Sequence, residues 1–323
     1  MKAERVVNRI TFDRSEAKPG ETLYVYVPKL DGNKVLVPGS LALVFKIDLA
    51  GGHENNFLVQ NVTRALVEKL VVKFGADTLQ DTGGYDLYKI WEDLFLPQVA
   101  RDDMLLEGIQ SEDLCKIRSD AADKKTSGVD KENALNKVYG KKYRIRLDHQ
   151  ILTDHGVFYP QALYHELQFQ LSLGPASQVV KGSDPDKLKY KLTNLQLEFE
   201  TIRSKTLADA ARSVYTAGKG FKYEHVVRPE VVNFKKEADS SLTIKFNAQR
   251  RALKGLLLLF VEPYVAGTRD SEKYINPDLK KVVVTVNGST NKLFNNGLGI
   301  TDTWAEVDRF FGKKTQKDRK SVV

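Results

Sequence analysis

Apolar and polar residues alternate along much of residues 1–203, which is the pattern of half-buried antiparallel strands. The alternation is clearest in 163–173 and 189–202. Further strands are predicted at 9–12, 22–27, 34–37, 41–47, 70–74 and 143–147. The apolar but mixed stretch 57–67 is left open as extended chain or one helical turn. This part of the chain is therefore predicted to be an antiparallel β-sandwich.

A strand, a polar turn and a short amphipathic helix occur twice in the chain. In the first copy the strand closes at Gly75 and the helix carries Trp91, and in the second the strand closes at Gly288 and the helix carries Trp304. Each glycine precedes its tryptophan by 16 residues, since 91 − 75 and 304 − 288 are equal. This spacing predicts two copies of one β-rich domain.

The repeat also extends upstream of each glycine. Strands ending at Phe45 and Phe260 lie 30 and 28 residues before Gly75 and Gly288. We therefore expect both phenylalanines and both tryptophans to pack in cores, and both glycines to close strands. The second helix is predicted to begin near Asp302, with a capping box made by Thr303 and Glu306, which are three residues apart.

These patterns divide the chain into a first domain, 1–203, a helical linker, 204–220, and a second domain, 221–323. Residues 98–142 contain nine acidic and nine basic side chains and few large apolar ones, so they are predicted to be a surface insertion. In the second domain, strands are predicted at 230–234, 242–246, 253–261 and 281–287. No strand is predicted after Trp304, so the second sandwich is expected to be incomplete. We favour truncation of a longer protein over a half domain covered by a partner.

The composition is that of a globular protein, with 41% hydrophobic and 28% charged residues among 323. No apolar run approaches the roughly 20 residues of a membrane span, and the N-terminus lacks the apolar core of a signal peptide. A single cysteine, Cys115, excludes an internal disulfide. Synthesis in a reducing intracellular compartment is expected.

Half of the formal charge of +8 lies at one end, because the last eleven residues carry five basic side chains and one acidic one. The rest of the chain is only mildly basic, whereas a dedicated nucleic-acid-binding module is expected to have a broad basic face. We interpret the tail as a solvated end that makes at most weak contact with DNA.

Candidate chemistry is sparse. His149, Asp154 and His155 are the candidates for a metal site, and we favour the interpretation that they belong to a polar loop. The His-x-His pattern of a cupin is absent, and His165 is predicted to be a paired structural histidine within a strand. Cys115 has no base beside it in sequence, and Gly218-Lys219-Gly220 is a turn rather than a phosphate-binding loop. We expect no metal, no cofactor and no enzymatic activity.

The chain resembles the double jelly-roll major capsid proteins of double-stranded DNA viruses, in particular those of Maverick/Polinton-like elements and adintoviruses. The stretches that carry this resemblance are 57–62, 86–95, 107–115, 143–149, 160–167, 190–195 and 270–275. The resemblance covers nearly the whole chain. It implies an all-β fold of two jelly rolls, with short helices in loops and an incomplete second roll.

The resemblance also implies a function, that of a hexon-type capsid subunit of the virion. Two rolls per chain in a homotrimer would give a pseudo-hexagonal capsomer, with neighbouring capsomers and penton or minor capsid proteins as partners. The insertion 98–142 would lie at one end of the first roll. Alternatives are a minor capsid or vertex protein, which needs only one roll, and a non-viral carbohydrate-binding β-sandwich. The latter predicts exposed aromatic residues at loops, and Phe158-Tyr159 is the single candidate pair.

Overall fold

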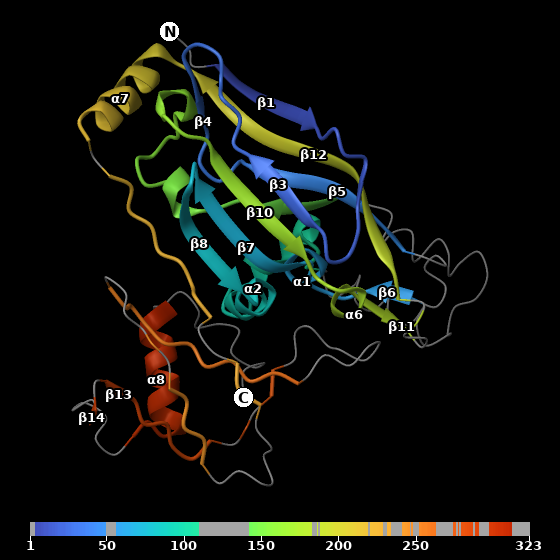
Figure 1. Cartoon of the computed structure of the whole chain (residues 1–323), viewed down its shortest axis with the longest axis vertical. Helices are drawn as coiled ribbons and strands as arrows, with labels where there is room; N and C mark the ends of the chain where they lie inside the picture. The colour runs from blue at the N-terminus through green and yellow to red at the C-terminus, as the bar shows by residue number, and fades with distance from the viewer. Residues whose placement is uncertain are drawn as a thin grey trace. The chain divides into compact units, whose positions relative to one another are not determined.

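The computed structural model gives two compact units (Figure 1). Unit 1 comprises residues 1–90, 102–228 and 264–271, and unit 2 comprises 91–101, 229–263 and 272–323. The structure describes residues 4–49, 56–109, 142–182, 186, 188–218, 220–228, 231–233, 241–245, 247, 252–262, 274–275, 277, 279–286, 288–290 and 297–311. Most of the predicted insertion, Cys115 and the basic tail lie outside these residues.

Unit 1 contains two main antiparallel sheets. The first has the order β1-β12-β5-β9, and the short strands β2 and β4 also pair with β12. The second has the order β3-β10-β7-β8. The strands of the first sheet are β1 (Glu4–Thr11), β2 (Glu16–Ala17), β4 (Lys34–Leu36), β5 (Ala42–Leu49), β9 (Tyr143–Arg146) and β12 (Tyr190–Arg203). Those of the second are β3 (Thr22–Tyr26), β7 (Val67–Phe74), β8 (Asp77–Gly83) and β10 (Leu167–Leu173).

The order of these strands is that of a jelly roll. When the eight strands of the two four-strand paths are numbered along the chain, the first sheet runs 1-8-3-6 and the second 2-7-4-5. Successive strands therefore cross between the sheets, except for the β7–β8 hairpin, and two Greek keys wrap around one core. The prediction of an all-β, jelly-roll fold is confirmed by this topology.

The core lies between the inner faces of the two sheets. Alternate side chains of β10 and β12 are buried, as the sequence pattern predicts. Phe45 on β5 is fully buried and stacks on Tyr143 of β9, with 6.3 Å between ring centroids. β12 contains a bulge, since its register with β5 shifts between Thr193 and Gln196, and Asn194 has a φ of 54°.

Short elements connect the strands. Residues 57–67, left open by the sequence, form part of β6 (Asn56–Leu58) and the one-turn helix α1 (Val62–Ala65), and β6 pairs with β11 (Val180–Gly182). The other short helices are α2 (Tyr85–Asp93), α3 (Gln98–Asp102), η1 (Leu105–Glu107), η2 (Gln150–Leu152), η3 (Pro160–Ala162) and α6 (Ala176–Val179). α7 (Lys205–Thr216) matches the predicted helix, and the Ser204 hydroxyl caps it by accepting from the Leu207 backbone N–H at 3.4 Å.

Two expectations, for the segment after Gly75 and for Trp91, need correction. The segment after Gly75, predicted to be a polar turn, is the strand β8. Its polar sequence has low strand propensity, and pairing with Lys69–Phe74 of β7 holds it in place. Trp91, expected in a core, is only half-buried on α2 and packs edge-to-face on Phe95.

Unit 2 contains the hairpin β13 (Thr285–Val286) and β14 (Ser289–Thr290) and the helix α8 (Ile300–Phe311). The predicted strands 242–246 and 253–261 are irregular where the structure describes them, because no neighbouring strand among the described residues pairs with them. Phe260 and Trp304, expected in the core, are half-buried.

The capping box of α8 lies earlier than predicted. The Asp302 carboxylate accepts from the Gly299 backbone N–H at 3.1 Å, and the Thr303 hydroxyl donates to the Gly299 carbonyl at 2.9 Å. Glu306 instead forms an ion pair with Arg309. Gly299 has no side chain of its own, so the aspartate three residues later supplies the side-chain half of the cap.

Candidate functional site

The three sequence-predicted metal candidates lie in one loop of unit 1, between β9 and β10. His149 caps η2, where its Nδ1 accepts from the Ile151 backbone N–H at 3.2 Å. Its ring is buried between Phe169 and Tyr223, with centroid distances of 6.5 Å and 5.1 Å. Burial, with a smaller contribution from the nearby His225 and against the opposing effect of Asp148, lowers the pKa of His149 to about 4.

The same loop binds a segment that we call the strap, residues 220–228, which follows α7 in extended form. The Asp154 carboxylate accepts from the Lys222 backbone N–H at 2.8 Å, and the Gln150 side chain accepts from the Glu224 backbone N–H at 2.8 Å. Side chains of the loop therefore satisfy the backbone of the strap as a neighbouring strand would.

Aromatic rings hold the beginning of the strap. The Phe221 ring lies 4.9 Å from His155, 6.2 Å from Phe158 and 5.3 Å from Tyr215. Further along, the Thr82 hydroxyl donates to the Val226 carbonyl, and the Arg228 side chain covers Gly84. The polar side chains of this loop therefore have a structural role, because they hold the strap against the roll.

The Asp154 carboxylate lies 3.8 Å from the His155 imidazole. His149 packs instead against the rings of Phe169 and Tyr223. Among the described residues there is no group of three potential metal-ligating side chains. The strap was missed by sequence reasoning. Its signal is the alternation of Phe221, Tyr223 and His225 with polar residues directly after a glycine.

The pair Phe158-Tyr159, considered as an exposed aromatic pair, is buried. Tyr159 packs with Val35 against Ala208 and Ala211 of α7. Its hydroxyl donates to the Gly32 carbonyl at 3.3 Å and accepts from Arg212 at 3.0 Å. These contacts fix α7 on the roll, so they are structural and the pair is no ligand platform.

A buried carboxylate fastens the start of the predicted insertion to the roll. Glu107 is fully buried, and its Oε1 accepts from Arg144 at 2.9 Å and from Arg146 at 2.7 Å on β9. The Thr63 hydroxyl of α1 donates to the Glu107 backbone carbonyl. A buried charge needs such partners, and here they fix where the chain leaves the roll.

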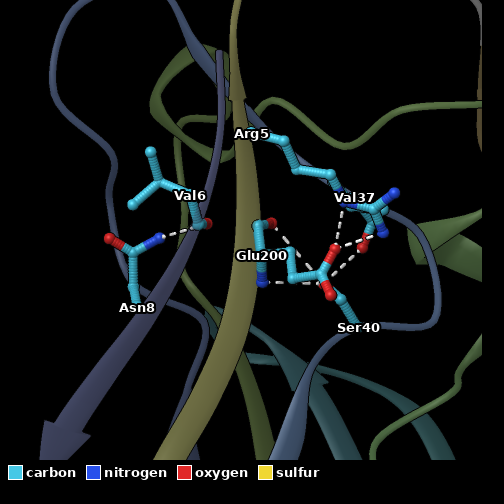
Figure 2. A network of polar contacts seen from close by, with 6 residues as sticks. All are labelled: Arg5, Val6, Asn8, Val37, Ser40 and Glu200. Carbon is cyan, nitrogen blue, oxygen red and sulfur yellow. Dashed lines mark hydrogen bonds and ion pairs between the residues drawn. The ribbon is translucent and has the colours of Figure 1, made fainter.

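The edge strand β1 is exposed on both faces. On its outer face Arg9 pairs with Glu198 at 2.7 Å, and Arg5 pairs with Glu200 (Figure 2). The Glu200 backbone also bonds the turn before β5, since its N–H donates to the Ser40 hydroxyl at 3.0 Å and its carbonyl accepts from the Val37 N–H at 2.9 Å. β12 is therefore bonded to β1 along one edge and to the turn before β5 along the other.

The inner face of β1 is different. Asn8 donates to the buried Thr201 hydroxyl at 3.0 Å, which shows that the even-numbered residues of β1 face the inside of the sheet. Val6 and Ile10 share this face, yet they are 39% and 45% exposed. The second sheet does not cover this face of β1, so it offers an apolar strip beside the core.

No family model and no curated protein matches the chain. Two matched solved structures are "PBCV-1 virus capsid, quasi-atomic model" (13% identity) and "Crystal structure of PBCV-1 VP54 fitted into a cryo-EM reconstruction of the virophage Sputnik" (12%), each with a TM-score of 0.37. In both cases the match covers 66% of this chain and 46% of the other, so the chain matches less than half the length of either.

Among the described residues no helix is long and apolar enough to cross a membrane.

Proposed function

We propose that this chain is a structural subunit of a viral capsid, of the Maverick/Polinton-like or adintovirus type, and that it assembles as a homotrimer. The jelly-roll order of unit 1 supports a wall-building role, because a closed sandwich is a rigid block with large lateral faces. The sequence stretches that resemble this capsid family support the assignment independently. The role is architectural, with no reaction assigned to any residue.

The observation that carries the proposal is the uncovered inner face of β1. Val6 and Ile10 continue the apolar core face of β12, so in a lone roll part of the core lining meets water. Burying apolar surface gains about 25 cal/mol per Å². A neighbouring subunit that covers this face would complete the roll, and threefold symmetry would repeat the contact around a ring.

The repeated hairpin–helix unit supports a second roll in the same chain. The described residues of unit 2 expose large apolar side chains in segments with strand-like sequence; examples are Leu242, Ile244, Leu253, Leu256 and Leu258. In our proposal these segments belong to the strands of a second roll, and two rolls in each chain of a trimer give 3 × 2 rolls per capsomer.

The remaining partners follow from the same proposal. Neighbouring capsomers and penton or minor capsid proteins would contact the outside of the trimer in the virion. The basic end, residues 313–323, lies outside the described residues, and weak contact with DNA is the role proposed for it.

The test is the mass of the particle in solution. The wild-type chain at micromolar concentration is expected to elute with three times the 36.4 kDa chain mass in size exclusion with light scattering. The double variant Val6→Glu/Ile10→Glu should lower the trimer fraction at least tenfold and leave the melting temperature of the monomer unchanged, because both side chains are already half-exposed.

The matched control is Val7→Glu, on the same strand but on the outer face, where Val7 is 56% exposed. This variant should still form trimers. A wild-type chain that stays monomeric at all concentrations, or a double variant that trimerises as well as Val7→Glu, would contradict the proposal.

A further inference from the structure

A second surface of unit 1 forms a hollow lined by aromatic and charged side chains. An open hollow of about 450 Å³ lies where β3 ends, where β7 turns into β8, and where the chain enters β10. The residues that line it are Tyr26, Lys29, Gly75, Tyr164, His165, Glu166 and Gln168. They come from three separate segments, so the jelly-roll topology assembles the hollow.

Local packing fixes the floor of the hollow. Gly75 has a φ of 60°, and its backbone N–H donates to the Glu166 carbonyl at 3.2 Å. A Cβ at Gly75 would lie 2.7 Å from the His165 ring, so the absence of a side chain allows the imidazole to sit on the turn. Phe74 and Tyr164 contact the same imidazole edge-on, with centroids 5.6 Å and 5.1 Å away.

Two tyrosines stand beside this floor. Tyr164 is 93% exposed and Tyr26 is 52% exposed, whereas tyrosine is typically intermediate in burial. Tyr26 is paired with Gln168 across β3 and β10, so their side chains share the outer face of the sheet. Two exposed rings at the rim of one hollow are more than isolated surface hydrophobics.

The polar groups of the hollow are positioned as well. Lys29 donates to the Leu163 carbonyl at 2.8 Å, which holds its ammonium at the rim. Gln168 accepts from Gln170 at 2.7 Å through its carbonyl oxygen, and within the described residues its amide nitrogen makes no further hydrogen bond. The exposed carboxylate of Glu166 adds an acceptor for two hydroxyl groups.

We infer that this hollow binds a neutral hexopyranose, such as the terminal residue of a glycan. The electron-rich face of an aromatic ring attracts the weakly positive C–H groups of a pyranose face, while the carboxylate and amide satisfy its hydroxyl groups. Among the lining residues Lys29 and Glu166 carry opposite charges, so the lining itself gives an anionic sugar no net attraction. This inference does not depend on the capsid role proposed above.

The experiment is saturation-transfer difference NMR on the full chain. The probes are the methyl glycosides of β-galactose, β-glucose and α-mannose, with glucuronic acid as the anionic comparator, each at 10 mM. At least one neutral glycoside should receive saturation on its ring protons, and glucuronic acid should receive less. Tyr26→Ala and Tyr164→Ala should each reduce the signal at least fivefold.

The matched control is Tyr24→Ala. Tyr24 is 53% exposed on the same face of β3, two residues from Tyr26, and it does not line the hollow. This variant should keep the full signal, and the melting temperatures of all three variants should equal that of the wild type. The inference is overturned if no neutral glycoside gives a signal, if glucuronic acid gives the larger one, or if Tyr24→Ala weakens it as much as the other variants.

Discussion

The two hairpin–helix units of this chain each have two residues, one of them glycine, between their paired strands, but the strands differ in length. β7 and β8 meet at Gly75 and span 67–74 and 77–83, whereas β13 and β14 meet at Gly288 and have two residues each. Both glycines have positive φ, 60° and 80°. The turn is therefore set locally in both copies, and strand length is set by something else.

Strand length in each copy depends on pairing with a neighbouring strand. β7 is paired with β10 along its other edge over almost its whole length, and β8 is held by β7. Among the described residues of unit 2, β13 pairs only with β14. An isolated two-stranded hairpin is marginal in water, so the second copy keeps its turn and loses its ladder.

The largest expected difference between the copies concerns the two phenylalanines. Phe45→Ala should lower the free energy of unfolding by about 3–5 kcal/mol, because it removes a fully buried ring from the roll. Phe260→Ala should cost less than about 1 kcal/mol, because Phe260 is half-buried. Urea denaturation followed by fluorescence measures both values. Equal costs would show that unit 2 has a core as tight as that of unit 1.

The second prediction concerns the stability of unit 1 in acid. The pKa of His149 in the fold, about 4, lies below its ordinary value of 6.5. The unfolded chain binds the proton first, so the free energy of unfolding should fall as pH drops from 6.5 to 4 and level off below that. The loss is at most about 3 kcal/mol. Urea titrations at several pH values measure it.

The control for acid is His149→Asn, which keeps a side-chain acceptor for the Ile151 N–H but does not titrate. Its stability should vary less between pH 6.5 and 4 than that of the wild type. An unchanged profile would mean that the imidazole is not buried against the strap.

The smallest contrast concerns the two turn glycines. Gly75→Ala should cost about 2–3 kcal/mol, because positive φ strains the alanine and its Cβ would clash with His165. A Cβ at Gly288 would lie in open space, so Gly288→Ala should cost about 1 kcal/mol, from the strain of the positive φ alone. Thermal melts compare the two. Identical losses would show that the contact with His165 yields without cost.

Sequence reasoning recovered most of the first roll. The runs 22–27, 41–47 and 189–202 match β3, β5 and β12 closely, because one face of each strand is buried and the alternation is strong. β8 was missed because five of its seven residues are polar, and the hydrogen bonds of β7 rather than its own side chains make it a strand.

At the candidate site, the sequence pointed to the polar residues but not to the segment that they contact. His149, Asp154 and His155 were noticed for their chemistry, but that chemistry serves the strap, whose residues lie about seventy positions later. Tyr26 and Tyr164 gave no signal in sequence, since nothing in a linear pattern tells an exposed tyrosine from a buried one.

By itself the sequence determined the alternation of the strands, the glycine turns and the helix at 205–216, because these depend on interactions within a few residues. Tertiary structure alone decided the strand order, the length of each ladder and the gathering of Tyr26, Gly75 and Tyr164 around one hollow. Strand pairing joins residues more than a hundred positions apart, and such contacts depend on topology rather than on local preference.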